Sequence, residues 1–192
     1  MAKHDPETEN HIAELIRAAE AGNAAAQTHL GWCYDEGEGV EVDHEKAFYW
    51  YTRSAEAGDA TGQFNLAMCY ELGTGTEIDC KKAFYWYEKS AEQGDQHAIC
   101  QLGIFYEEGI GCDPDPVKAV ELYRKAGGMG NSLAVNRLGY CCEEGIGTEK
   151  NPALAVDFYK IAAAAGLVSA QFNLARCYDN AIGTRKNMRL AA

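Results

Sequence analysis

The sequence predicts an all-α protein, an α/α right-handed superhelical solenoid built from 36-residue helix-turn-helix repeats. Three observations predict it. Similar residues recur every 36 positions without a slip, each unit contains two runs with helical hydrophobic spacing, and glycines or capping residues separate the runs. One column of the repeat is entirely leucine: Leu30, Leu66, Leu102, Leu138 and Leu174.

The two ends of the chain differ from the repeats between them. We expect residues 1–10 to be a flexible N-terminus and residues 11–22 to form a capping helix, because Ile12 and Leu15 occupy second-helix slots with no first helix before them. One continuous array of tandem repeats follows, at 23–58, 59–94, 95–130, 131–166 and 167–192. The fifth repeat stops inside its second helix, whereas solenoids normally close with a polar cap. We therefore expect a fragment of a longer protein.

The first helix of each repeat is predicted by apolar and small residues at i, i+3, i+4 and i+7. In the first repeat this stripe is Gln27, Leu30, Gly31 and Tyr34. The small residue at the slot of Gly31 would let a neighbouring helix approach closely. Gly37 and Gly39 follow where a helix C-terminus requires a positive φ, so the helix is expected to end there.

The second helix of each repeat is predicted by its capping residue. Side chains that accept hydrogen bonds from backbone N–H groups recur before the helical run: Asp43, Asp79, Asp115, Asn151 and Asn187. Pro116 and Pro152 then stand at the first helical position, where proline is tolerated. In the third repeat, "AGGMGN" at 126–131 places two extra glycines at the helix end, which predicts a loosened end there.

The aromatic run "AFYWY" at 47–51 returns at 83–87. Phe48, Trp50 and Tyr51 are expected to pack between helices. Tyr49 is the exception, because its column changes from aromatic to acidic: Tyr49, Tyr85, Glu121 and Asp157. If Tyr49 and Tyr85 are both exposed, they would form a secondary contact on the outer face.

Composition excludes several classes of partner. The formal net charge is −12 with 17 Lys and Arg, which argues against nucleic acid and favours a basic partner. The N-terminus has no apolar signal region and no long apolar run occurs, so neither secretion nor membrane insertion is expected.

The eight cysteines then favour a reducing compartment, and we expect a cytoplasmic protein. Four of them share one repeat slot with Phe105, which indicates buried packing: Cys33, Cys69, Cys141 and Cys177. Cys80 and Cys112 fall in predicted loops and are the two most exposed candidates.

No motif predicts a catalytic residue, a metal or a cofactor. The "GEGV" and "GTGT" loops lack the Lys and the preceding strand of a phosphate loop. His29 with Cys33, and His97 with Cys100, each have the spacing of half a metal site without further ligands nearby. Adjacent carboxylates such as Glu107 and Glu108 do not face each other on a helix. An enzyme, or a thiol-based redox or metal-binding protein, stays open as the alternative class.

The repeat resembles the Sel1-like repeat of the tetratricopeptide-like superfamily over residues 11–192. The residues that carry the resemblance in the first repeat are Leu30, Gly31, Tyr34, Gly37, Gly39, Val40, Asp43, Lys46, Ala47, Trp50, Tyr51 and Gly58. The cysteines do not follow the pairing pattern of secreted members, so their disulfides are not carried over. The resemblance implies an interaction scaffold without a shared catalytic residue.

In tetratricopeptide-like arrays the first helices line the concave face, which implies a binding site there for a protein or peptide. First-helix residues outside the buried stripe are expected to stack from repeat to repeat along that face, and each such column of equivalent positions is called a ladder. One ladder contributes Thr28, Phe64, Asn136 and Phe172; the next contributes Trp32, Met68, Ile104, Tyr140 and Arg176; and an acidic ladder contributes Asp35, Glu71, Glu107, Glu143 and Asp179.

An apolar strip beside carboxylates suits a basic or amphipathic segment. Recurring carboxylates near a helix C-terminus are unfavourable for the helix dipole, which hints at a use beyond stability. Packing of the apolar ladder between neighbouring first helices, with solvated carboxylates, is the alternative. Self-association through the C-terminal end is another.

Overall fold

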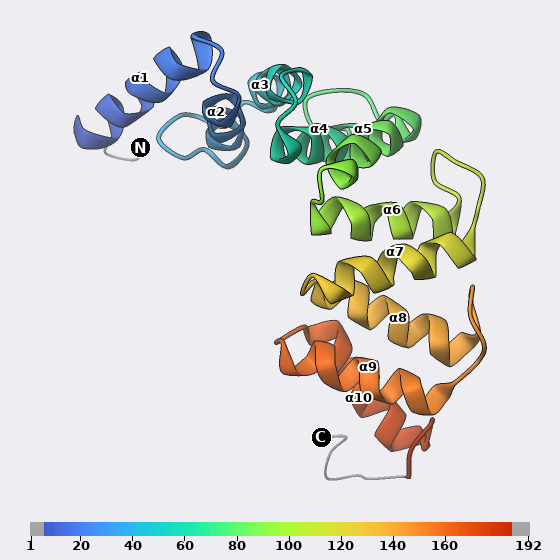
Figure 1. Ribbon diagram of the computed structural model, residues 1–192. Helices are drawn as coiled ribbons and strands as arrows, with labels where there is room; N and C mark the ends of the chain where they lie inside the picture. The colour runs from blue at the N-terminus through green and yellow to red at the C-terminus, as the bar shows by residue number, and fades with distance from the viewer. Residues whose placement is uncertain (1–5, 186–192) are drawn as a thin grey trace. The chain divides into compact units, whose positions relative to one another are not determined.

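The computed structural model describes residues 6–185, which form ten α-helices and no strand (Figure 1). The chain divides into two compact units, an N-terminal unit of residues 1–95 and a C-terminal unit of residues 96–192. The N-terminal unit contains α1 (Pro6–Glu20), α2 (Ala24–Glu36), α3 (His44–Glu56), α4 (Ala60–Leu72) and α5 (Cys80–Glu92). The C-terminal unit contains α6 (Gln96–Glu108), α7 (Pro116–Gly128), α8 (Ser132–Glu144), α9 (Pro152–Ala164) and α10 (Val168–Asn180). The predicted all-α solenoid of repeats is confirmed.

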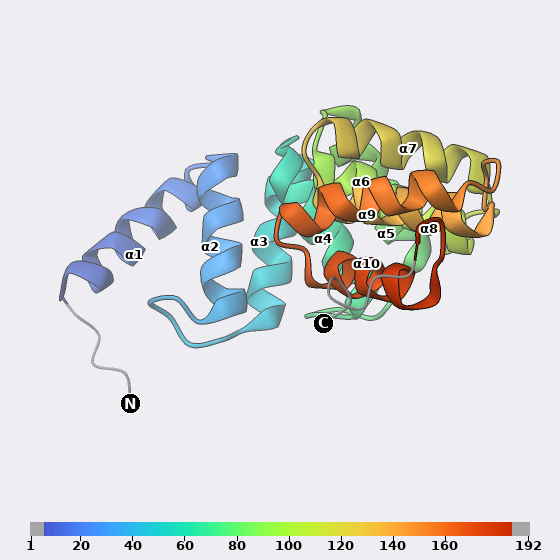
Figure 2. The ribbon, with the colours of Figure 1, turned by 90° about the horizontal axis from the view of Figure 1, so that it is seen from below.

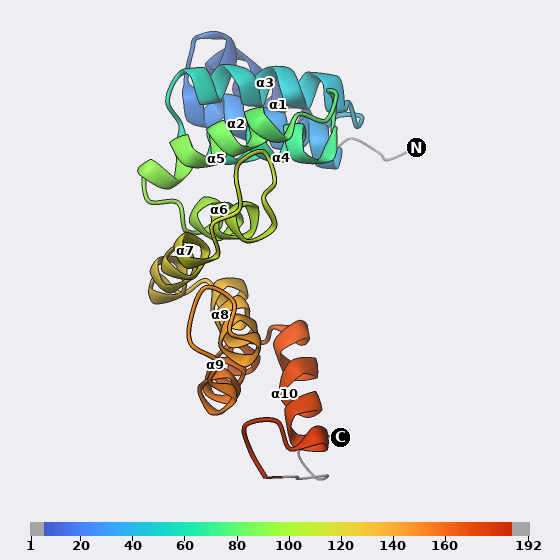
Figure 3. The same ribbon diagram turned by 90° about the vertical axis from the view of Figure 1, so that its right-hand side faces the viewer.

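Helices that follow one another in the chain pack against one another within each unit. In the N-terminal unit α1 packs on α2, α2 on α3, α3 on α4 and α4 on α5 (Figure 2). In the C-terminal unit the same order holds from α6 to α10 (Figure 3). The even-numbered helices are the first helices of the repeats, and α3, α5, α7 and α9 are the second helices.

The predicted caps of the second helices are present. Asp43, Asp79 and Asp115 each accept a hydrogen bond from the backbone N–H three residues later, and Asn151 does the same for Leu154 N. Asn187 lies outside the described residues. At the other end of the first helices Gly37 and its counterparts take left-handed φ, whereas the fifth repeat places Ala181 there with φ 56°.

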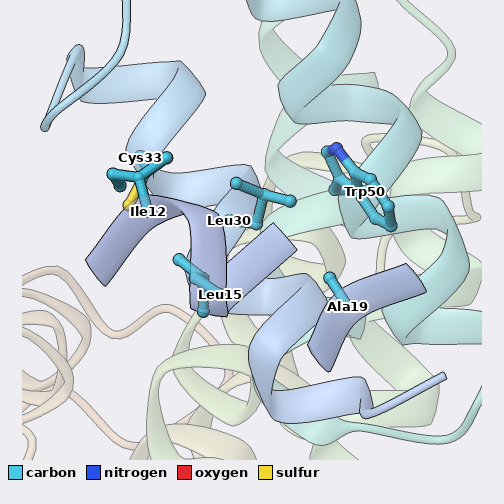
Figure 4. Close-up of a cluster of buried hydrophobic side chains, with 6 residues drawn as sticks. All are labelled: Ile12, Leu15, Ala19, Leu30, Cys33 and Trp50. Atoms are coloured by element: carbon cyan, nitrogen blue, oxygen red, sulfur yellow. The ribbon is translucent and has the colours of Figure 1, made fainter. Parts of the chain in front are cut away.

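The N-terminal helix begins at Pro6, five residues before His11, the expected start of the capping helix. Proline suits this first position because its missing N–H would have no partner there. The helix covers the first repeat, and Figure 4 shows its three apolar side chains against the next two helices. The buried cluster comprises Ile12, Leu15, Ala19, Leu30, Cys33 and Trp50.

The loosened helix end predicted at Gly127 and Gly128 is not found. α7 continues through Gly128 and has 13 residues, the length of every helix from α2 to α10. A Cβ added at Gly127 would lie 3.0 Å from Val135 Cγ2. The packing of α8 against this backbone therefore outweighs the low helix propensity of glycine.

A second loop glycine fixes the distance between neighbouring repeats. Gly75, Gly147 and Gly183 all have positive φ. Each lies against the backbone carbonyl of a residue that begins the second helix of the preceding repeat, and a Cβ there would overlap the oxygen of His44, Pro116 or Pro152. This slot requires glycine for two reasons, its φ and the backbone that it touches.

We expect Gly147→Ala to destabilise the C-terminal unit more than Gly130→Ala. Both positions have positive φ, so both variants lose roughly 1–2 kcal/mol from the left-handed conformation. Only Gly147 also meets a neighbouring backbone, because nothing lies within 4 Å of a Cβ at Gly130. Urea denaturation should show at least about 1 kcal/mol more loss for Gly147→Ala, and equal losses would contradict the close approach.

Candidate functional site

The sequence-predicted binding residues lie on the first helices, as expected, but they do not form one uniform surface. In the N-terminal unit α2 and α4 contact each other directly. An open groove of about 370 Å³ lies between them and contains the predicted residues Thr28 and Trp32. Its lining is Ala25, Thr28, His29, Trp32, Asp59, Thr61 and Asn65.

A smaller hollow of about 60 Å³ continues this groove, since Asn65 lines both. It brings in the predicted residues Asp35 and Met68, together with Leu72. We call the two hollows together the α2–α4 groove. Trp32 is 43% exposed in it, with the ring of His29 at 5.9 Å between centroids.

Polar groups hold the floor of the α2–α4 groove in place. Thr28 Oγ1 lies 2.6 Å from Ser54 Oγ and donates to Asp59 Oδ1 at 2.9 Å. Ser54 Oγ donates its single proton either to Thr28 Oγ1 or to the carbonyl of Ala24, and Asp59 caps α4 by accepting from Gly62 N. Thr28 therefore links three helices and also lines the groove.

The acidic ladder has a structural use that the sequence argument did not recognise. Glu71, Glu107 and Glu143 accept hydrogen bonds from the hydroxyls of Tyr87, Tyr123 and Tyr159, at 2.5, 2.5 and 2.9 Å. Each tyrosine lies on the second helix of the same repeat and is fully buried. The recurrence of carboxylates at this slot is therefore explained by the need to satisfy a buried hydroxyl. For these three residues stability alone is a sufficient reason for the carboxylate, so its recurrence no longer points to a further use.

Tyrosines of the second helices also explain the small residues of the first helices. Cβ atoms added at Gly31, Gly103 and Gly139 would fall 2.7, 2.5 and 2.6 Å from ring carbons of Tyr51, Tyr123 and Tyr159. Burial raises the pKa of these three tyrosine hydroxyls well above its ordinary value, and neighbouring carboxylates raise it further. The predicted close approach at this column is confirmed.

In the C-terminal unit arginines occupy the first-helix face. Arg176 of α10 donates to Glu143 Oε2 of α8 at 2.6 Å, and Arg137 of α8 lies 3.8 Å from Glu107 Oε2 of α6. Glu143 is 4% exposed. Two of the predicted acidic residues are thus paired inside the repeat array and are not available to steer a partner.

The sequence-predicted site did not include one polar column of the first helices. Its residues line the α2–α4 groove in the N-terminal unit and form contacts between first helices in the C-terminal unit. It stands beside the leucine column and reads His29, Asn65, Gln101, Arg137 and Asn173. Asn173 Nδ2 donates to Asn136 Oδ1 at 3.1 Å, and the predicted site residue Asn136 is buried. The position of this polar column next to the leucine column was the sequence signal that could have identified it.

The two units also differ in formal charge. Residues 1–95 carry 19 Asp and Glu against 7 Lys and Arg, whereas residues 96–192 carry 10 of each. The whole excess of negative charge therefore belongs to the N-terminal unit, which also contains the α2–α4 groove.

The remaining predicted residues vary in exposure. Tyr140 is 40% and Phe172 is 70% exposed, Asp179 is exposed, and Phe64 and Ile104 are half-buried. On the second helices Tyr49 and Tyr85 are both 49% exposed. The condition for a secondary contact there is met.

All eight cysteines are free, and only Cys80 and Cys112 are partly exposed. Burial raises the pKa of the Cys69, Cys100 and Cys141 thiols to about 12. Within residues 6–185 no group of three or more His, Cys, Asp or Glu residues could hold a metal ion. No helix of that part of the chain is long and apolar enough to cross a membrane.

Comparison with known proteins gives a family match across the array. The family model for the Sel1 repeat matches residues 24–59, 60–95, 96–131, 132–167 and 168–192. A comparison with curated proteins gave no match.

Two solved structures are similar in sequence and fold. A Sel1 repeat protein from Oxalobacter formigenes is 35% identical with a TM-score of 0.85, over 97% of this chain and 80% of that one. A protective antigen of uropathogenic Escherichia coli with an SLR fold is 36% identical with a TM-score of 0.83. That similarity covers 92% of this chain but only 38% of the antigen's chain.

We expect Glu143→Gln to remove stability at neutral pH and less at low pH. Burial would raise the pKa of Glu143, but hydrogen bonds from Arg176 and Tyr159 outweigh it and lower the pKa below its ordinary value of 4.5. A lowered folded-state pKa contributes stability above the unfolded-state pKa, and this is lost as pH falls through the folded-state value.

Breaking this pair should cost about 3 kcal/mol at pH 7, with a smaller difference from wild type at pH 3. Urea denaturation at the two pH values measures both. Glu144→Gln, at the exposed neighbouring position, is the control and should change little. A difference between Glu143→Gln and wild type that is the same at both pH values would contradict the assignment.

Thiol labelling should distinguish two groups of cysteines. Cys80 and Cys112 should react first in the native protein, because the other six are buried. The six should react only after denaturation. Mass spectrometry of labelled peptides identifies the sites, and rapid native labelling of Cys33, Cys69 or Cys177 would contradict the packing described.

Proposed function

The chain belongs to the Sel1-repeat family, and we propose that it is a protein-interaction scaffold whose binding site is the α2–α4 groove. Sel1-repeat proteins are commonly interaction scaffolds and generally non-catalytic. The observation that carries the proposal is the exposed Trp32 ring in an open groove of the acidic unit. Large aromatics that line a hollow are the side chains on which binding energy concentrates.

The proposed partner is an extended or amphipathic basic segment of another protein. The N-terminal unit has an excess of 12 acidic residues, which favours approach of a positively charged chain. Asn65 lies where the two hollows meet and offers both a donor and an acceptor to an extended backbone. Asp35, which forms a 2.8 Å contact with His44 Nδ1, stands at the far end of the groove.

The C-terminal unit supports this choice by contrast. There Arg137 and Arg176 pair with the carboxylates of the neighbouring first helix, and formal charges balance. We therefore propose that it contributes less to capturing a basic partner than the N-terminal unit does.

We expect Trp32→Ala to reduce partner capture and Tyr49→Ala to leave it unchanged. The two aromatics are matched in exposure, at 43% and 49%, but Tyr49 lies on α3, away from the groove. Loss of an aromatic anchor should lower affinity by roughly tenfold or more. Affinity capture with the full chain as bait, followed by titration of a captured partner, measures this.

Salt should weaken the same interaction, because charge attraction across a surface is screened above about 0.1 M ionic strength. Capture that is insensitive to both salt and Trp32→Ala would contradict the proposed site. Loss with Tyr49→Ala alone would move the site to the second helices.

A further inference from the structure

A separate hollow lies in the C-terminal unit, on a face that the proposed function does not use. It has a volume of about 270 Å³ and is bounded by α7, α8 and α9. Its lining consists of Arg124, Gly127, Gly128, Val135, Leu138, Phe158 and Ile161. We call it the α7–α9 pocket. All but one of these residues are apolar or glycine.

The α7–α9 pocket is created by departures from the repeat. Two repeats earlier in the chain, five of these seven positions hold larger or more polar side chains. The pairs of corresponding residues, with the earlier repeat first, are Ala55 and Gly127, Glu56 and Gly128, Gln63 and Val135, Trp86 and Phe158, and Lys89 and Ile161. Five changes that converge on one hollow remove bulk or polarity in every case.

Hydrogen bonds occupy the corresponding place in the N-terminal unit. Gln93 Nε2 donates to Gln63 Oε1 at 2.8 Å, and Gln63 Nε2 donates to the carbonyl of Ala55 at 3.3 Å. The counterparts of these two glutamines are Ala165 and Val135, which can form neither bond. The polar filling of the earlier repeat is thus replaced by an apolar hollow.

One cation stands at the α7–α9 pocket. Arg124 is exposed, and its counterpart two repeats earlier is the uncharged Thr52. Among residues 10–185, whose side chains the structure describes, no carboxylate forms an ion pair with Arg124. A guanidinium beside an apolar hollow favours a ligand with an apolar body and a carboxylate.

Size limits that ligand. An apolar cavity of about 150 Å³ holds benzene, so a pocket of about 270 Å³ has room for a ring and a short chain, but not for a helix of a partner protein. We propose that the α7–α9 pocket binds a small apolar carboxylic acid, with its body against Val135, Leu138 and Ile161 and its carboxylate on Arg124.

Titration of the full chain with 4-phenylbutyrate tests the proposal, with methyl NMR signals as the readout. Shifts should concentrate at Val135, Leu138 and Ile161, and 4-phenylbutanol should bind at least about tenfold more weakly because it lacks the charge. Absence of shifts at millimolar 4-phenylbutyrate, or shifts elsewhere only, would overturn the proposal.

Three variants test the parts separately. Arg124→Gln should weaken 4-phenylbutyrate binding by about tenfold. Lys125→Gln, the matched control at the next position, should leave it unchanged.

Gly128→Glu restores the residue type of the earlier repeat at a position where a Cβ meets nothing within 4 Å. It should retain helix content and abolish binding, because it places a carboxylate at the pocket. Equal affinities for Arg124→Gln and wild type would overturn the charge assignment, as would undiminished binding to folded Gly128→Glu.

Discussion

The hydrogen bond from a buried tyrosine hydroxyl to a carboxylate on the partner helix is the interaction on which the second, third and fourth repeats depend. In the third and fourth repeats the ring packs against the first helix at a glycine, and the hydroxyl reaches a carboxylate one turn further along. An unsatisfied buried hydroxyl would cost about 1–3 kcal/mol, so ring, small residue and carboxylate are required together. This set fixes the angle and separation of the two helices, and the loop glycines then join one repeat to the next.

This constraint decides which acidic residues are available for binding. In the C-terminal unit Glu107 and Glu143 hold a tyrosine and an arginine, so they satisfy the interior. The excess negative charge lies instead in the N-terminal unit, which also contains Trp32 and the α2–α4 groove. One repeat pattern thus supports two different faces, an open acidic groove in one unit and ion-paired helices in the other. Differences between repeats, rather than the shared pattern, distinguish the candidate sites.

The repeat period predicted the helices, their caps and the close approach at Gly31, because these depend on local spacing and backbone chemistry. It did not predict that Glu143 pairs with Tyr159 and Arg176, because a recurring carboxylate does not identify its partner on another helix, whereas a recurring small residue does indicate a close approach. Propensity failed at Gly127, where packing of Val135 keeps the helix intact. Trp32 was predicted as a binding residue from its place in the mostly apolar ladder of the first helices. The groove around it also includes His29 and Asn65, which belong to the polar column and not to the predicted ladders.

A spectrophotometric tyrosine titration with parallel circular dichroism tests the central claim most directly. The ordinary tyrosine pKa is 10.0, and burial raises it for Tyr51, Tyr123 and Tyr159. A raised pKa means that stability is full below the ordinary value and is lost as pH rises above it. We predict two phases: exposed tyrosines ionise near their ordinary pKa with the helices intact, and the buried ones ionise only in a cooperative step that coincides with loss of helix. Ionisation of all tyrosines in one phase, with the helices intact, would contradict the account.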